Sequence, residues 1–192
     1  MGTPLTTETA SSTPSLKLDN VGDEVKFAVI DVAMNLPQTV FGSNPPVPAL
    51  NAAGKPKTAH CLTVLVLDAG GATIGDGNGG HIPASANEVA NIWIASYSKY
   101  DPDRDSITAP FMSWAGATDA VGLEVGHIGS WKYIAELPPT RAGNNGRRDR
   151  KFRLRRAEAT EAGIVEQCER LHAERKAGGT VLPTDSHDEE PF

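Results

Sequence analysis

Apolar and polar residues alternate with a period of two along several short stretches of the chain, and this pattern predicts β-strands. We predict strands at residues 25–34, 61–67, 88–100, 128–137 and 151–156. Two other stretches, 106–121 and 160–177, carry apolar residues at helical spacing and begin with a Ser or Thr that can cap a helix. The sequence therefore predicts a mainly β protein, with one helix between the third and fourth strands and a second helix after the fifth.

The first predicted strand is apolar on both of its faces. Its side chains alternate so that one face carries Val25, Phe27 and Val29 and the other carries Ala28, Ile30 and Val32. In a small closed barrel, a curved strand serves two parts of the core in this way. We therefore expect the five strands to close into a barrel.

The third predicted strand divides into an apolar face and a mixed face. Ile92 and Ile94 lie on the apolar face, whereas Trp93, Tyr97 and Lys99 lie on the other. Aromatic rings among polar groups, on a face that lies over a core, are typical of surfaces that bind single-stranded nucleic acid. A Trp that only packs inside the protein is an equally good interpretation of this strand alone.

The fourth and fifth strands flank a loop rich in Pro, Gly, Asn and Arg. Trp131 and Tyr133 share one face of the fourth strand. A dense group of basic residues follows in the loop and the fifth strand, opposed only by Asp149: Arg141, Arg147, Arg148, Arg150, Lys151, Arg153, Arg155 and Arg156. A β-ribbon with aromatic rings and a cationic flank can stack bases and follow a phosphate backbone. The segment alone leaves open a solvated basic loop beside ordinary core aromatics.

The formal net charge of −6 has the wrong sign for a simple nucleic-acid binder. The distribution matters more, because the arginines form one local group and the acidic residues concentrate at the C-terminus. The two cysteines, Cys61 and Cys168, lie far apart and imply no disulfide framework, which fits a reducing compartment. The sequence shows no signal-peptide pattern and no apolar run long enough for a membrane span. We expect a cytoplasmic protein.

No motif in the sequence points to catalysis. The five histidines show neither H-x-H nor H-E-x-x-H spacing, and neither a nucleophile motif nor a phosphate-binding Gly-rich loop is present. The Gly-rich stretch 68–86 predicts a flexible loop or a hairpin tip. Its G-D-G-N-G-G run is similar to one turn of a calcium-binding repeat, but it occurs once, and repetition is what makes such sites. We therefore predict no enzymatic activity, no cofactor and no metal site.

We expect four parts along the chain: a disordered N-terminus at 1–15, a folded domain at 16–157, a C-terminal helix at 158–178, and a linker with an acidic tail at 179–192. The tail reads D-S-H-D-E-E-P-F. Its aromatic end can enter an apolar pocket of a partner protein, or the tail can compete with DNA for the protein's own basic surface. The residues expected to bind a partner are Asp185, Asp188, Glu189, Glu190, Pro191 and Phe192.

This acidic ending in Pro-Phe resembles the C-terminal tip of single-stranded DNA-binding proteins of bacteria and of double-stranded-DNA phages. The order of predicted strands, loops and helix over residues 16–156 resembles their OB-fold. The resemblance implies a five-stranded OB-fold Greek-key barrel that coats and protects single-stranded DNA during replication, recombination and repair. It also implies that the tail recruits a polymerase, primase, helicase or recombination protein. Whether the chain forms a homo-oligomer stays open.

The resemblance also gives roles to individual residues. Phosphate contacts are implied for Arg141, Arg147, Arg148, Arg150, Lys151, Arg153 and Arg155, and stacking on bases for Trp93, Tyr97, Trp131 and Tyr133, with Lys99 on the same face as Trp93. The competing interpretation is a non-catalytic structural or interaction module, such as a virion protein or an adaptor, with an OB-like or sandwich core. In that case, the Arg-rich loop would bind an acidic protein.

Overall fold

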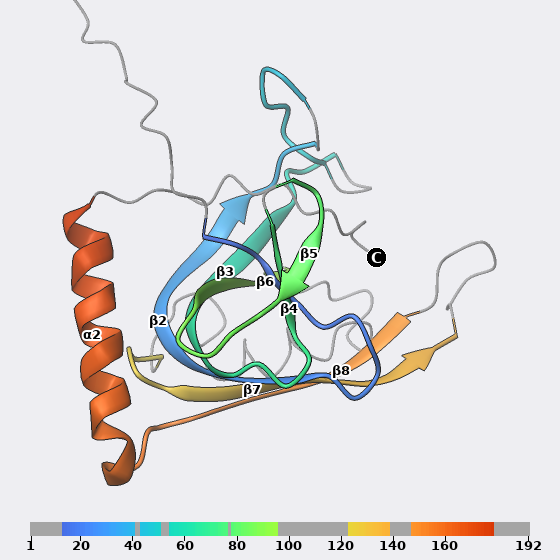
Figure 1. The fold of residues 1–192 in the computed structure, drawn as a ribbon. Coiled ribbons are helices and arrows are strands. Elements are labelled where there is room, and N and C mark those ends of the chain that lie inside the picture. The colour runs from blue at the N-terminus through green and yellow to red at the C-terminus, as the bar shows by residue number, and fades with distance from the viewer. Residues whose placement is uncertain are drawn as a thin grey trace, which may run out of the picture.

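The computed structural model of the chain describes residues 13–40, 43–50, 54–76, 78–95, 123–138 and 147–178. These residues form two antiparallel sheets and one long helix (Figure 1). The protein is therefore mainly β, as predicted.

The larger sheet has five strands in the order β6-β3-β2-β7-β8. The strands are β2 (Glu24–Pro37), β3 (Thr58–Asp68), β6 (Val89–Ala95), β7 (Ile128–Leu137) and β8 (Arg147–Arg155). All five predicted strands are confirmed. The continuation of β6 beyond Ala95 and the helix predicted at 106–121 lie outside the described residues.

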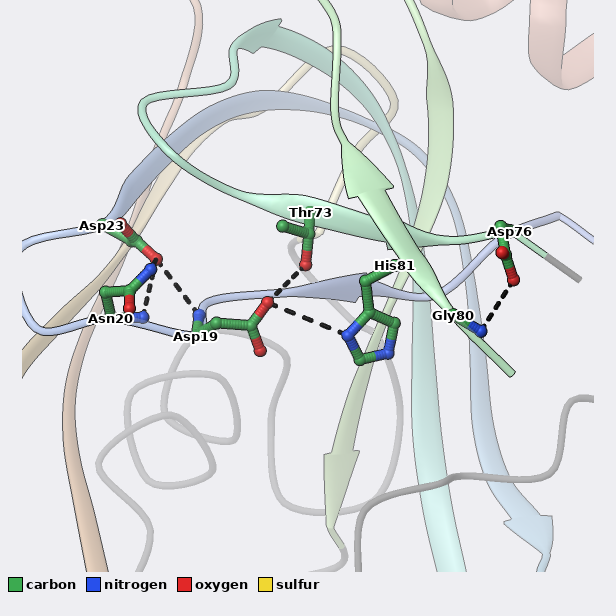
Figure 2. Close-up of polar contacts among 7 residues, drawn as sticks. All are labelled: Asp19, Asn20, Asp23, Thr73, Asp76, Gly80 and His81. Carbon is green, nitrogen blue, oxygen red and sulfur yellow. Dashed lines mark hydrogen bonds and ion pairs between the residues drawn. The ribbon is translucent and has the colours of Figure 1, made fainter. Parts of the chain in front are cut away.

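The smaller sheet has the order β1-β4-β5. Its strands are β1 (Leu16–Lys17), β4 (Thr73–Gly75) and β5 (His81–Pro83). The connection between β4 and β5 is closed by Asp76, whose Oδ1 accepts hydrogen bonds from the N–H groups of Asn78 and Gly80, both at 2.8 Å. Figure 2 shows the bond to Gly80. The stretch predicted as a loop or hairpin tip is thus a hairpin that adds to β1.

One hydrophobic core lies between the two sheets. Val25, Phe27 and Val29 of β2 are buried there, together with Leu62 of β3 and Ile92 of β6. From the other side, the smaller sheet and its flanks contribute buried Leu16, Leu18 and Ile74. Because β6 and β8 both send side chains into this core, the five-stranded sheet curls around it.

A β-bulge in β2 changes the predicted alternation of its side chains. The register against β3 shifts between Val29 and Asp31. As a result, Val32 packs with the same core as Val29, whereas we expected it to share a face with Ala28 and Ile30. A bulge inserts one residue into a strand, so every later side chain changes face.

Helix α2 (Ala162–Ala177) packs against the outer face of the larger sheet (Figure 1). A short 3-10 helix, η1 (Ala159–Glu161), leads into it. The fully buried Cys168 lies against Ala28, Ile30 and Leu65, and Ile164 and Leu171 flank it on the helix. The predicted C-terminal helix is confirmed, and its apolar stripe covers the sheet.

Residues 13–15 lie along β6, although we expected them to belong to a disordered N-terminus. Ser15 forms a parallel bridge with Asn91, and the Asn91 N–H donates to the carbonyl of Pro14 at 2.8 Å. The Asn91 side chain donates to the carbonyl of Thr13 at 3.2 Å and accepts from the hydroxyl of Thr63 at 3.0 Å. Among the described strands, β6 and β8 form no ladder, so the predicted closed barrel is replaced there by an open, curled sheet.

Candidate nucleic-acid interface

The register of β8 against β7 separates its basic residues into two groups. Phe152 is opposite Trp131 and points into the core, so Lys151 and Arg153 point outward and are exposed. Lys151 lies directly opposite Lys132, and Arg153 lies directly opposite Ser130. The next strand, β2, continues these two rows with Glu24 and Lys26. Three adjacent strands thus carry a surface that we call the basic face, made of Lys26, Lys132, Lys151 and Arg153.

Two of these four cations already have an acidic partner. Lys26 Nζ lies 3.8 Å from a carboxylate oxygen of Asp68, and Lys132 Nζ lies 3.1 Å from one of Glu24. Lys151 and Arg153 make no ion pair with any other described residue. Like charges directly opposite each other weaken a sheet, so an anion held between Lys132 and Lys151 would stabilise this pair.

Arg150 lies on the inner side of β8. Its side chain is 8% exposed, and its guanidinium carbon lies 5.2 Å from the ring centroid of Trp131, at cation–π distance. Trp131 and Tyr133 are each 4% exposed. Stacking on a base needs an open ring face, and these two rings are buried. We therefore do not include Trp131, Tyr133 or Arg150 in the candidate interface.

Arg155 bonds to the segment that leads into helix α2. Its guanidinium donates to both carboxylate oxygens of Glu161, each at 2.7 Å, and lies 4.0 Å from Glu158. This pairing lowers the pKa of Glu161 to about 2 and raises the pKa of Arg155. Arg155, which we predicted to contact phosphate, therefore bonds to carboxylates of the protein itself.

The remaining predicted residues are distributed as follows. Trp93 is half-buried on the outer face of β6, directly opposite Cys61, and β6 is at the other end of the strand order from β8. Arg147 and Arg148 form the first two positions of β8. The other predicted site residues lie outside the described part of the chain: Tyr97, Lys99, Arg141 and the tail residues Asp185, Asp188, Glu189, Glu190, Pro191 and Phe192.

The far halves of β7 and β8 extend beyond β2 as a two-stranded ribbon (Figure 1). A bulge begins this ribbon, because Tyr133 pairs with Arg150 and Ala135 with Asp149, which leaves Ile134 as the extra residue. The Ile134 side chain is 42% exposed. We did not identify Ile134, Lys132 or Lys26 from the sequence, because we read β7 by its aromatic face and they lie on the opposite face or on β2.

A turn at residues 19–23 connects β1 to β2, and its side chains contact the smaller sheet (Figure 2). Asp23 Oδ2 accepts hydrogen bonds from the N–H groups of Asp19, at 3.1 Å, and Asn20, at 2.8 Å. Asp19 Oδ2 in turn accepts from the Thr73 hydroxyl at 2.7 Å and lies 3.9 Å from His81 Nδ1. These contacts fix the shape of the turn.

The other side of the same turn is bonded to the start of the ribbon. The Gly22 N–H donates to the Tyr133 carbonyl at 2.9 Å, and the Tyr133 N–H donates to the Asp23 carbonyl at 3.0 Å. Val21, next in the chain, is 57% exposed. The turn therefore presents an apolar side chain alongside the stretch of β7 that carries Ile134.

Within the described ranges, no group of three or more His, Cys, Asp or Glu side chains is arranged to hold a metal ion. None of the helices in those ranges is long and apolar enough to cross a membrane. Comparison with known proteins gave no matching family model, no matching curated protein and no matching solved structure.

Proposed function

We propose that this chain is a non-catalytic protein that binds single-stranded DNA on its basic face. The observation that carries the proposal is the register of β2, β7 and β8. It brings four cations from three adjacent strands onto one surface and leaves Lys151 and Arg153 without an acidic partner in the described part of the chain. Lys and Arg side chains that share one surface bind the phosphate backbone.

The strand order supports an OB-like core. In an OB-fold, the first strand lies between the second and the fourth, the third lies beyond the second, and the fifth lies beyond the fourth. Counting β2, β3, β6, β7 and β8 as strands one to five, the order β6-β3-β2-β7-β8 is compatible with this arrangement if the barrel is open between its third and fifth strands, and it supports the proposal of an OB-like core. OB-folds are partly open barrels that bind oligonucleotides or oligosaccharides on strands two and three and on the loops after strands one and four. Strands two and three correspond to β3 and β6, which lie beside the basic face in the strand order.

This assignment gives roles to other residues. The second–third strand face corresponds to β3 and β6, where the half-buried Trp93 is the remaining stacking candidate. The loop after the fourth strand corresponds to the connection between β7 and β8, which contains Arg141 and leads into Arg147 and Arg148. The acidic tail would recruit replication or recombination proteins. The two buried free thiols, Cys61 and Cys168, fit a reducing compartment such as the cytoplasm.

Titration of a labelled oligo-dT at several salt concentrations tests the proposal. Each phosphate neutralised on a single strand contributes about −0.7 to the slope of log K against log salt. Contacts from all four cations give a slope of about −3, so raising salt from about 50 to 200 mM should weaken binding about 50-fold. A duplex of the same length should bind more weakly.

A charge-neutralised variant ties the effect to the basic face. Lys151→Gln with Arg153→Gln should reduce the slope by about 1.4, which makes the salt-induced loss about sevenfold smaller. Arg170→Gln with Lys176→Gln is the matched control, since it removes the same two charge types from exposed positions of α2. Absence of binding to either nucleic acid, or equal effects of the two double variants, would refute the proposal and favour an acidic protein as the ligand of this face.

A further inference from the structure

The bulge in β7 turns an isoleucine toward solvent. Ile134 has no residue directly opposite it on β8, and its side chain is 42% exposed. Bulges re-aim side chains and are frequent next to functional sites. Since Ile134 belongs to neither hydrophobic core, its apolar side chain contributes little to folding and is available to a ligand.

Ile134 lies next to the basic face. It follows Lys132 by two residues and is exposed, whereas the intervening Tyr133 is buried in the core. Ala135, which follows Ile134, is opposite Asp149, two residues before Lys151 on β8. The exposed Val21 belongs to the adjacent turn, whose neighbour Gly22 is hydrogen-bonded to Tyr133. Figure 2 shows the contacts of Asp19, Asp23 and Thr73 that fix this turn. The structure thus presents a small apolar surface, on a fixed backbone, next to cations.

We propose that Ile134, with Val21 beside it, contacts the face of an unstacked base in a strand whose phosphates lie on Lys132, Lys151 and Arg153. This inference rests on the proposed function and deepens it by naming a base contact. A base offers a flat apolar face next to its own phosphate, which matches an apolar side chain next to a lysine. In a duplex, the base faces are stacked and out of reach, so this contact selects single strands.

Binding of Ile134→Ser to oligo-dT and to an abasic oligomer of the same length tests the contact. The variant should bind oligo-dT about fivefold more weakly than the unaltered chain, which corresponds to about 1 kcal/mol. Its affinity for the abasic oligomer should not change, and neither should its salt slope, because no charge is removed. Ile82→Ser on β5 is the matched control: Ile82 is 47% exposed, and β5 belongs to the smaller sheet.

A second variant works in the opposite direction. Ile134→Trp should bind oligo-dT more tightly and show quenching of the new Trp fluorescence, since base–aromatic stacking is stronger than an aliphatic contact. Equal affinity of Ile134→Ser and the unaltered chain for oligo-dT, an equal loss on the abasic oligomer, or an equal loss in Ile82→Ser would each overturn the inference. In those cases, the salt-dependent binding of the unaltered chain still supports the proposed function. If the unaltered chain binds neither oligomer, the proposed function itself fails.

Discussion

Gly129 lies where the core leaves no room for a side chain. It is directly opposite Phe27 on one side and Leu154 on the other, in the middle of the β2-β7-β8 register. A Cβ added here would overlap the Phe27 ring and approach Leu154 Cδ2 to 2.9 Å. The Phe27 ring cannot move freely, because it is fully buried and its centroid lies 5.7 Å from that of Phe152.

The expected cost of Gly129→Ala combines two effects. Overpacking a core typically costs about 1–3 kcal/mol. Replacing Gly by Ala returns about 0.4–1 kcal/mol, because the unfolded chain becomes less flexible. The free energy of unfolding should therefore fall by roughly 1–2 kcal/mol, which for a chain of this size lowers Tm by about 2–8 °C.

Thermal and urea unfolding, followed by circular dichroism, measure this change. Gly75→Ala in β4 is the control, because a Cβ there meets no atom within 4 Å. The control should leave Tm unchanged or slightly raised.

A double-mutant cycle identifies the cause. If the Phe27 ring is the obstacle, Phe27→Leu should cost at least about 1 kcal/mol less in the Gly129→Ala chain than in the unaltered one. The reasoning is refuted if Gly129→Ala is as stable as Gly75→Ala, or if the two substitutions at 129 and 27 are additive.

Three further predictions concern titratable groups. Carboxyl NMR should show Glu161 titrating near pH 2, and Arg155→Gln should return its pKa toward the ordinary value, since the guanidinium bond stabilises the ionised form. Burial lowers the pKa of His60 and His127, whose Nδ1 atoms each accept a backbone N–H, so stability should be complete above about pH 6.5 and fall as the pH drops below it. Urea titrations at neutral and mildly acidic pH measure this slope, which cannot exceed about 1.4 kcal/mol per pH unit for each histidine; a flat profile contradicts it. Burial raises the pKa of Cys168 to about 11, so native protein should resist alkylation there at pH 8, and rapid labelling would show that α2 leaves the sheet.

The alternation of apolar and polar residues with a period of two identified every strand of the larger sheet. Successive side chains of a pleated strand point to opposite faces, so a strand with one buried face shows this alternation. The bounds predicted for the fourth strand are those of β7. The sequence could not locate the bulge that turns Val32 back into the core, since bulges depend on the pairing of two strands. Nor could it show that residues 13–15 bind the edge of β6, because the hydrogen bonds to Asn91 join parts of the chain far apart in sequence.

The candidate site was predicted less completely than the fold. Alternation shows that Trp131 and Tyr133 share a face, but not whether that face is inside. The resemblance implied that both rings stack on bases, whereas both lie in the core and Lys132 lies on the outer face. In the same way, the basic run could not reveal that Arg155 binds Glu161 or that Arg150 covers Trp131, since both contacts depend on the final packing.

The contact of residues 13–15 with β6 has a practical consequence for where the domain can be cut. A chain shortened to start at Leu16 would lose the acceptors for both Asn91 donors and would expose the backbone of β6. Uncovered strand edges pair with other molecules, so such a fragment should aggregate even with every core residue present. The same cut would remove the Thr13 hydroxyl that accepts from Arg175 at 3.1 Å, loosening the last turns of α2. Truncations for crystallisation should therefore begin before Thr13.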